Sequence, residues 1–297
     1  TLATDGFFGD HAAAQCRPAT GCERLEFLAI DQAMEDFLCD RDVPGATLAI
    51  ARDGVLLYER GFGWSDRART ETMPPDALMR TASVSKPLTV SAVRELIADG
   101  AFALDSYAFD LGQPEGGLLD LEPFPSLGDD RLAEITVRHL IEHRGGWNRD
   151  VAGDLTYREI SIASAMGVPS PPGRVNTVRY ILGQPLQFTP GDERQYSNIG
   201  GLVLGLIIEQ ESGVAVERFI QDRVLSPLGI ADADHQAGRT FENDQDDREP
   251  WYASTTSAVN VFDPTGPLVA RPYGGWDHEA RIGQGGQLAT AGALAIA

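Results

Sequence analysis

A β-hairpin pattern near the start of the chain is the sequence feature that most restricts the possible folds. The run Ala46 to Ala51, the pair Asp53-Gly54 and the run Val55 to Phe62 predict two antiparallel strands joined by a tight turn. Two strands do not make a stable sheet alone. We therefore expect partner strands from elsewhere, and in this sequence they would have to come from after residue 250.

Helical patterns lie on both sides of the hairpin. Residues 25–38 place apolar side chains at helical spacing, whereas residues 1–24 are small and polar and predict a tail. Further helices are predicted at Pro87 to Ala98, Val137 to His143, Gly201 to Glu211 and Val214 to Leu225. The acidic segment Asp110 to Asp130 and the charged segment Arg239 to Glu249 predict solvated loops.

These patterns divide the chain into an expected set of regions. After the tail of residues 1–24, residues 25–63 form the first helix and hairpin of an α/β sheet domain, and residues 64–240 form a mainly helical domain. Residues 241–297 return toward the sheet domain. Because the final segment Gln287 to Ala297 resembles the opening of a helix, we expect further sheet strands to lie outside the given sequence, which would then be incomplete.

The charge of the chain excludes some partners. With 44 acidic and 24 basic side chains, the formal net charge is −20, which repels nucleic acid and anionic lipid. The longest apolar stretches, Ile199 to Ile208 and Leu288 to Ala297, are shorter than the roughly 20 residues of a membrane-spanning helix. We expect neither nucleic-acid binding nor a membrane span.

The cysteines give information about the cellular compartment of the protein. Cys16, Cys22 and Cys39 lack the paired spacing of a zinc site. A bridge from Cys16 to Cys22, or from Cys22 to Cys39, would indicate an oxidising compartment, and three free thiols are the alternative. The chain begins at Thr1 without Met, which fits a processed start. These features favour a periplasmic or secreted location over a cytoplasmic one.

Lysine usage is unusual, because 23 of the 24 basic residues are Arg and Lys86 is the single Lys. Arginine keeps its proton, whereas burial can turn an amine neutral. A position that retains the only amine is a candidate for proton transfer. The alternative is that one Lys survived by drift.

A serine accompanies this lysine. Ser83 and Lys86 lie three residues apart at the predicted helix start, with Pro87 in the first turn, so both side chains project from one face. Serine needs a neighbouring base to act as a nucleophile, and an amine needs its pKa lowered from about 10.4 to serve as that base. In the alternative interpretation, Ser83 or Ser85 caps the helix.

A second motif, Tyr196-Ser197-Asn198, precedes an apolar helix. A phenol and a carboxamide two residues apart can project into one space, where the phenol relays a proton and the amide holds a carbonyl or an amine. In the alternative interpretation, Asn198 caps the helix and Tyr196 packs.

Together these motifs resemble the serine β-lactamase and penicillin-binding-protein superfamily, in particular its class-C-like esterase and DD-peptidase branch. The resemblance covers most of residues 26–290. It includes these anchors: Val43-Pro44-Gly45-Ala46, Thr81 to Pro87, Val137 to Gly146, Pro190-Gly191-Asp192 with Tyr196 to Asn198, Leu225 to Ile230, and Gly285 to Thr290. It implies an α+β, β-lactamase/transpeptidase-like fold, in which helices flank an antiparallel sheet and a mainly helical domain adjoins it, with the active site at their seam.

The resemblance also implies roles for individual residues. Ser83 would be the acylated nucleophile, Lys86 the neighbouring proton acceptor, and Tyr196 a second base that passes a proton to the leaving group. Asn198 would orient Lys86 and the substrate. Because the acylation base is disputed in related β-lactamases, the division between Lys86 and Tyr196 stays open.

One family element has no counterpart at a suitable position. The family's third motif, Lys or His followed by Thr or Ser and then Gly on a strand, follows well after the segment that resembles Gly285 to Thr290. That strand supplies one of two backbone oxyanion donors, and losing a donor costs about a hundredfold or more in rate.

Other histidines and aromatic residues are secondary candidates. We expect His143 to be structural, and His278 could line the cleft, although a lone loop histidine is commonly a surface residue. An apolar acyl pocket could include several aromatic residues: Trp147, Trp251, Tyr252, Tyr273 and Trp276. In the alternative interpretation most of them are packing residues, and one or two reach the substrate, with Trp147 and Trp276 as the candidates.

Three functions fit these residues. The favoured one is a serine hydrolase acting on small carboxylic esters, and the second uses the same site on a β-lactam or a D-Ala-D-Ala peptide. The third is a non-catalytic binding or assembly protein on the same fold. The expected partner is a small ester or amide, no metal or organic cofactor is implied, and the oligomeric state is not predicted.

Overall fold

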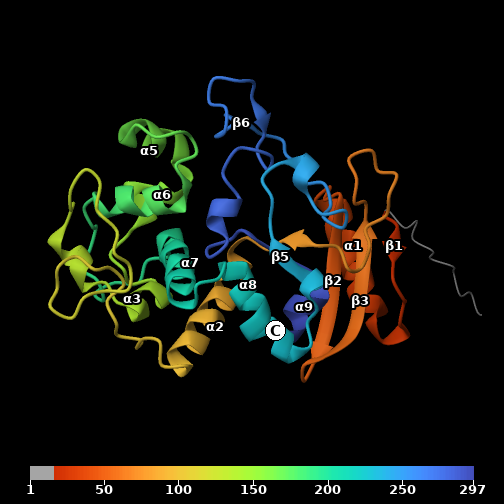
Figure 1. Ribbon diagram of the computed structural model, residues 1–297. Coiled ribbons are helices and arrows are strands. Elements are labelled where there is room, and N and C mark those ends of the chain that lie inside the picture. The colour runs from red at the N-terminus through yellow and green to blue at the C-terminus, as the bar shows by residue number, and fades with distance from the viewer. Residues whose placement is uncertain (1–16) are drawn as a thin grey trace, which may run out of the picture.

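The computed structural model describes residues 17–297 and combines a sheet-containing part with a mainly helical part (Figure 1). In this range the α-helices are α1 (Leu28–Asp40), α2 (Ser85–Ala98), α3 (Val137–Ile141), α4 (Arg149–Ala152), α5 (Glu159–Met166), α6 (Gly173–Leu182), α7 (Asn198–Ser212), α8 (Val216–Ile220) and α9 (Ala291–Ile296). The strands are β1 (Ala19–Thr20), β2 (Gly45–Arg52), β3 (Val55–Gly63), β4 (Met79–Arg80), β5 (His235–Ala237), β6 (Ser257–Ala258), β7 (Val269–Ala270) and β8 (Gln287–Ala289). Among the shorter helical turns are η2 (Ala82–Val84), η4 (Leu155–Tyr157) and the π-helical η5 (Gln221–Leu225).

The predicted hairpin is present as the antiparallel pair β2 and β3. Asp53 and Gly54 both have positive φ, 55° and 74°, as a type I′ turn requires. On its other side β3 pairs with β1, so the sheet order is β1-β3-β2. The expectation that the partner strand of the hairpin comes from after residue 250 is therefore wrong for β3, because β1 pairs with it. The expectation that residues 19–20 belong to a tail is also wrong, because they form β1. Two residues are too few for a periodic pattern. Residues 1–16 of that tail lie outside the described range.

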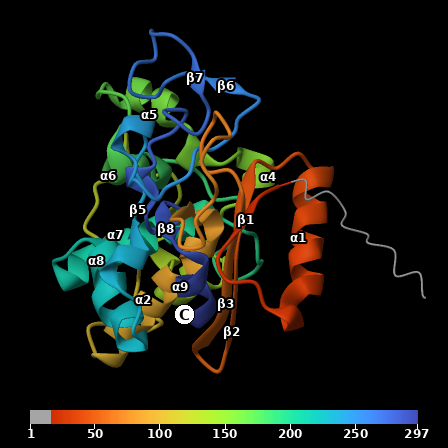
Figure 2. The same ribbon diagram turned by 90° about the vertical axis from the view of Figure 1, so that its right-hand side faces the viewer.

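Helices cover both faces of this sheet, α1 on one side and α9 on the other (Figure 2). The Asp31 carboxylate on α1 accepts hydrogen bonds from Tyr58 Oη (2.6 Å) and Arg60 Nη1 (3.2 Å) on β3. All three side chains are buried. Breaking a buried ion pair leaves an uncompensated charge, so this cluster holds α1 in one position on the sheet.

A second small sheet joins distant segments in the order β4-β8-β5. Met79 and Arg80 pair with Ala289 and Leu288, which brings the approach to Ser83 beside the final residues of the chain. The segment Gln287 to Ala297, expected to open a helix, divides into β8 and α9. The helix starts only at Ala291 because Thr290 Oγ1 caps it by accepting from the Ala293 amide (3.1 Å).

The helical part is organised around α2 and α7, which pack against each other. Every residue of α7 from Asn198 to Ile208 is buried. On its face toward Gly283 and Gln284, α7 carries two glycines. A Cβ on Gly201 would lie 2.9 Å from Gln284 Cα, and one on Gly205 would lie 3.2 Å from Gly283 Cα. Glycine therefore allows the backbone at 283–284 to lie directly against this helix.

Helix boundaries differ from the sequence-based expectations in ways that affect the site. Helix α2 begins at Ser85 after the turn η2, and α7 begins at Asn198 because Ser197 is its N-cap. Helix α3 ends before His143, whose φ is 58°. The predicted helix from Val214 to Leu225 divides into α8 and the π-helical η5.

The expected cysteine pairings are not found. Within residues 17–297, Cys22 is an exposed free thiol, whereas Cys39 is disulfide-bonded. Neither bridge that includes Cys22 forms, and the alternative of three free thiols is also wrong. Cysteine spacing alone does not determine which thiols meet in the fold. Cys16 lies outside the described residues.

In the described part of the chain, no single helix is long and apolar enough to cross a membrane.

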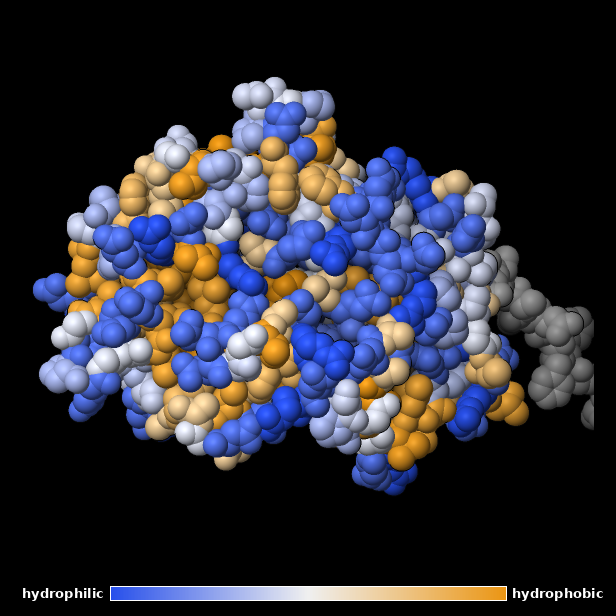
Figure 3. Space-filling model, in the orientation of Figure 1, coloured by the Kyte–Doolittle hydropathy of each residue, from blue (hydrophilic) through white to orange (hydrophobic). Residues whose placement is uncertain are grey.

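The space-filling view shows a mostly hydrophilic face with apolar side chains gathered mainly over the helical part (Figure 3).

Candidate active site

Ser83 lies in the turn η2, where β4 leads into α2. Thr81 Oγ1 donates to the Gln287 carbonyl (2.9 Å) and shares a hydrogen bond with Ser85 Oγ (2.7 Å), so residues on both sides of Ser83 are anchored. Ala82 has a φ of 46°, a conformation that costs energy for a residue with a Cβ. This backbone holds Ser83 exposed, with its hydroxyl open to a reactant.

Lys86 is buried one turn further along α2. Its Nζ lies 2.8 Å from Asn198 Oδ1, 2.6 Å from the Gln284 carbonyl and 3.2 Å from Ser83 Oγ. Burial lowers the pKa of Lys86 below its ordinary value, against the opposing effects of Tyr196 and Asp154. The amine is thus held between two carbonyl oxygens and the serine hydroxyl, with its charged form disfavoured.

Tyr196 reaches the same hydroxyl from the loop before α7. Its Oη lies 2.6 Å from Ser83 Oγ and 3.3 Å from Asn198 Oδ1. Burial alone would raise the pKa of Tyr196, but hydrogen bonds to Lys86 and Ser83 and the positive charges of Lys86 and Arg149 lower it overall. The structure therefore brings Ser83, Lys86, Tyr196 and Asn198 together.

The alternative interpretations, in which Asn198 and Ser83 or Ser85 cap helices, are wrong. Ser197 Oγ caps α7 by accepting from the Ile199 amide (3.2 Å), which frees the Asn198 amide to contact Lys86. Ser83 Oγ contacts Tyr196 and Lys86, and Ser85 Oγ contacts Thr81.

Two cationic or aromatic neighbours support the Tyr196 ring. The His143 ring lies 4.8 Å from it, centroid to centroid, and the Arg149 guanidinium carbon also lies 4.8 Å from its centroid. The Ser197 amide donates to His143 Nδ1 (3.4 Å), and burial, together with the charges of Lys86 and Arg194, lowers the pKa of His143. The structure places His143 against Tyr196 rather than at the Ser83 hydroxyl.

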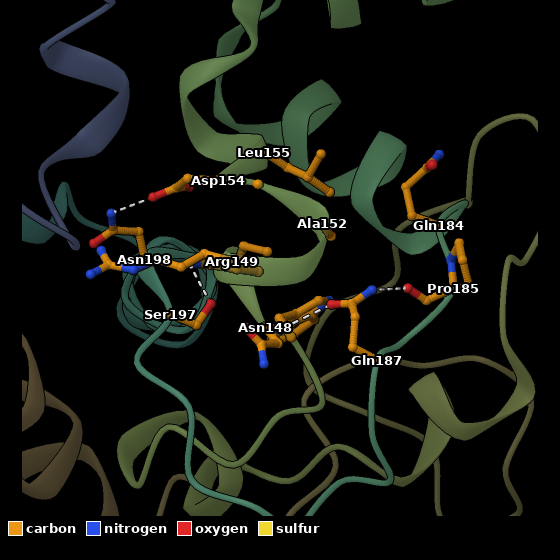
Figure 4. Close-up of a pocket in the computed structure, with 13 residues that line it drawn as sticks. Asn148, Arg149, Ala152, Asp154, Leu155, Gln184, Pro185, Gln187, Ser197 and Asn198 are labelled. Carbon is orange, nitrogen blue, oxygen red and sulfur yellow. Dashed lines mark hydrogen bonds between the residues drawn. The ribbon is translucent and has the colours of Figure 1, made fainter.

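Two cavities flank these side chains. The first has a volume of about 170 Å³ and extends from Asn198 along α4 (Figure 4). Its lining includes Trp147, Asp154, Leu155, Pro185, Gln187 and Asn198. The second has a volume of about 120 Å³ and adjoins Ser83 directly, with a lining that includes Ser83, Tyr157, Trp276, His278, Arg281 and Gln284.

The aromatic residues considered for an acyl pocket do not lie together. Trp147 lies in the first cavity and Trp276 in the second, where it packs edge-on against Tyr157 with centroids 6.2 Å apart. The others lie elsewhere. Arg80 stacks on Tyr252 and Tyr273, and Trp251 lies under Arg67.

The interpretation of His278 as a surface residue is wrong. It is buried, it lines the second cavity, and its Nδ1 accepts from Trp276 Nε1 (3.2 Å). Burial lowers its pKa to about 3, so His278 is neutral. Residue type alone could not reveal that the segment after Trp276 folds back into the core.

Sequence reasoning missed three contributors to this site. Asp154 Oδ2 accepts from Asn198 Nδ2 (2.7 Å), the Gln284 carbonyl accepts from Lys86, and Arg149 faces Tyr196. Asp154 precedes Thr156 as a helix-capping signal, which predicts a local role only. Asn198 lies 44 positions further along the chain, and no local pattern connects the two.

Across residues 17–297, no cluster of three or more His, Cys, Asp or Glu side chains is placed to hold a metal ion.

Several known proteins are similar to this chain. Esterase EstB of Burkholderia gladioli is 32% identical over 206 residues, which are 68% of this chain and 50% of that protein. The octameric penicillin-binding protein homologue from Pyrococcus abyssi has a TM-score of 0.62 at 24% identity, covering 92% of this chain and 55% of that one. A family VIII carboxylesterase has a TM-score of 0.60 at 18% identity, covering 92% and 68%. At these identities the solved structures show the fold alone.

The chain spans about half the length of the curated relatives it matches. The family model described as Beta-lactamase matches residues 29–296, nearly the whole described range. The α+β, β-lactamase/transpeptidase-like fold expected from the motifs is confirmed. The chain therefore belongs to the beta-lactamase family.

Proposed function

We propose that this protein is a serine hydrolase that forms an acyl-enzyme on Ser83 and hydrolyses small carboxylic esters. One observation carries the proposal. The exposed Ser83 hydroxyl lies 2.6 Å from Tyr196 Oη and 3.2 Å from Lys86 Nζ, and the pKa values of both neighbours are lowered. Both groups can therefore take the serine proton near neutral pH more readily than an ordinary tyrosine or lysine.

The chemistry follows from these contacts. Ser83 Oγ attacks the ester carbonyl carbon while its proton passes to Tyr196 Oη or Lys86 Nζ, whichever is unprotonated. The tetrahedral intermediate collapses, its bond to the alcohol oxygen breaks, and the same proton moves to that oxygen. Water then attacks the acyl carbonyl carbon and gives one proton to the base. The bond from that carbon to Ser83 Oγ breaks, the proton returns from the base to Oγ, and the carboxylic acid is released.

Two observations support esters as the substrate class. The curated relatives include an esterase by name. The cavity beside Ser83 measures about 120 Å³ and the one beside Asn198 about 170 Å³, both below the roughly 300 Å³ at which pockets for drug-sized ligands begin. We therefore expect short acyl groups.

A fluorophosphonate probe tests the nucleophile. Intact-mass and peptide analysis should find one adduct, on Ser83, and none in Ser83→Ala. The variant Ser164→Ala is the matched control, because it changes an exposed serine on α5 that does not line the cavity beside Ser83. Absence of an adduct on the wild-type protein would contradict the proposal and favour a binding protein on the same fold.

Substrate class is tested by comparing kcat/KM for p-nitrophenyl acetate, p-nitrophenyl laurate and nitrocefin. We expect the acetate to be hydrolysed most efficiently. A higher kcat/KM for nitrocefin would instead assign the site to β-lactams.

We further propose an oxidising location, periplasmic or extracellular, which the disulfide at Cys39 supports. Intact mass of the protein from its native host after alkylation without reduction tests this. Alkylation of all three cysteines would contradict it.

A further inference from the structure

The side-chain amide of Asn198 can be placed in two ways that exchange its oxygen and nitrogen. In the observed orientation Oδ1 accepts from Lys86 Nζ (2.8 Å), and Nδ2 donates to Asp154 Oδ2 (2.7 Å). Figure 4 shows the Asp154 carboxylate and the Asn198 amide facing each other. An ionised carboxylate only accepts hydrogen bonds, so it selects the orientation that turns the amide nitrogen toward itself.

The other oxygen of Asp154 is held as firmly. Asp154 Oδ1 accepts from the Thr156 amide (3.1 Å) and from Thr156 Oγ1 (2.7 Å) at the start of η4. Because the Thr156 hydroxyl donates its hydrogen bond to Asp154, its oxygen can accept one from Gln284 Nε2 (3.2 Å). The backbone carbonyl of Gln284 in turn accepts from Lys86 (2.6 Å).

These contacts close a ring of hydrogen bonds through five residues, Lys86, Asn198, Asp154, Thr156 and Gln284. Asp154 is the member that can only accept, so it determines the direction in which the neighbouring groups donate. Both acceptors presented to Lys86, the Asn198 and Gln284 oxygens, are connected to Asp154 through this ring.

The direction of these hydrogen bonds determines whether Lys86 can act as a base. A neutral amine has two N–H bonds and one lone pair. If both N–H bonds point to the Asn198 and Gln284 oxygens, the lone pair is left for the side of the amine where Ser83 Oγ lies 3.2 Å from Nζ and where the Tyr196 hydroxyl also interacts with it. If Asn198 turned its nitrogen toward Lys86, that lone pair would accept from the amide instead and could not take the serine proton.

We propose that Asp154 is a positioning residue, which acts through Asn198 to aim the Lys86 lone pair at Ser83. This inference rests on the proposed function. The charged and titratable groups around the amine are Tyr196, His143 and Arg149 in addition to Asp154, and Arg281 interacts electrostatically with Asp154. Among the groups that act on Lys86, the Asp154 carboxylate favours the ammonium form, against burial and Arg149.

The first test measures the amine directly. Lys86 is the only lysine in the chain, so ¹³C-lysine labelling yields one side-chain signal whose titration gives its pKa without assignment. Asp154→Asn removes the negative charge and permits the amide to turn, and both effects lower the pKa of Lys86. The matched control Asp150→Asn removes an equal charge from an exposed position on α4 and should leave the pKa within error. An unchanged or raised pKa in Asp154→Asn would overturn the inference, because loosened packing that admits water raises it.

The second test uses ester hydrolysis. Asp154→Asn should lower kcat/KM by about tenfold or more, and Asp154→Glu should restore part of it. In an Asn198→Ala background the same Asp154→Asn change should cost less than about twofold, because the residue through which it acts is gone. Additive losses would show a merely structural role and contradict the proposal. If the wild-type protein neither hydrolyses esters nor reacts with the fluorophosphonate, the proposed function fails. A smaller shift in the pKa of Lys86 on Asp154→Asn in the Asn198→Ala background than in the wild-type background would still show that Asp154 acts through Asn198, and an equal shift would contradict it.

Discussion

At the residue scale, the site depends on a buried amine beside an exposed hydroxyl. Lys86 and Ser83 lie in adjacent turns, so one short stretch of chain supplies both the nucleophile and a base. The amine loses its preference for the charged form through burial, a property that arginine does not share.

Replacing Lys86 with Arg keeps the positive charge but removes the proton acceptor. We expect the acylation rate, measured by the burst of p-nitrophenol or by fluorophosphonate labelling, to fall by about 10²–10⁴-fold. Arg94→Lys makes the reverse exchange at an exposed position on α2 and should leave the rate unchanged. An unaltered rate in Lys86→Arg would refute Lys86 as the base.

The pH profile reports the same groups. Acylation needs an unprotonated base, so activity is lost as pH falls through the pKa of that base. Burial lowers the pKa of Lys86, and contacts with Lys86 and Ser83 lower that of Tyr196, so the rising limb of kcat/KM should lie below the ordinary values of 10.5 and 10.0. In Tyr196→Phe the remaining limb should move to lower pH, because Tyr196 raises the pKa of Lys86. A limb that moves to higher pH would contradict this assignment.

At the element scale, the approach of α7 to the segment 283–284 sets the position of the Gln284 carbonyl. Gly201→Ala would place its Cβ 2.9 Å from Gln284 Cα, so backbone must move. We expect a loss of about 1–3 kcal/mol in stability and a lower kcat/KM. Gly205→Ala, whose Cβ would lie 3.2 Å from Gly283 Cα, should have a smaller effect on both. Thermal unfolding and ester hydrolysis measure the pair. A more stable and equally active Gly201→Ala variant would contradict the role of this contact.

Elements with a local signal could be predicted from the sequence, and elements formed by distant contacts could not. Asp53-Gly54 encodes the β2–β3 turn in two residues, and Ser83 with Lys86 encodes a shared helix face. The two residues of β1 carry no periodicity, and their pairing depends on Phe62 and Gly61. Likewise, the meeting of Asp154, the N-cap of η4, with Asn198 depends on how η4 packs against α7.

At the scale of the whole molecule, a net charge of −20 acts on every residue at once. Surface ion pairs involve many of the arginines, but acidic groups outnumber basic ones by 44 to 24, so repulsion between carboxylates dominates. The hydrophilic face in Figure 3 exposes these charges to solvent and salt.

We therefore expect NaCl to stabilise the protein by screening this repulsion. Between 20 mM and 500 mM NaCl the Tm should rise, by about 2–4 °C for each kcal/mol of repulsion removed. Sulfate is avoided because it also strengthens apolar burial. A Tm that stays constant or falls with NaCl would show that screened ion pairs outweigh the repulsion.

The Gln284 carbonyl, which accepts from Lys86 at 2.6 Å, belongs to the main chain. Alanine scanning and saturation mutagenesis exchange side chains and leave every peptide oxygen in place. A complete substitution library would therefore score position 284 only through its side chain and would pass over its contact with the amine. Selection faces the same restriction, so this acceptor persists through sequence drift for as long as the local backbone path is preserved.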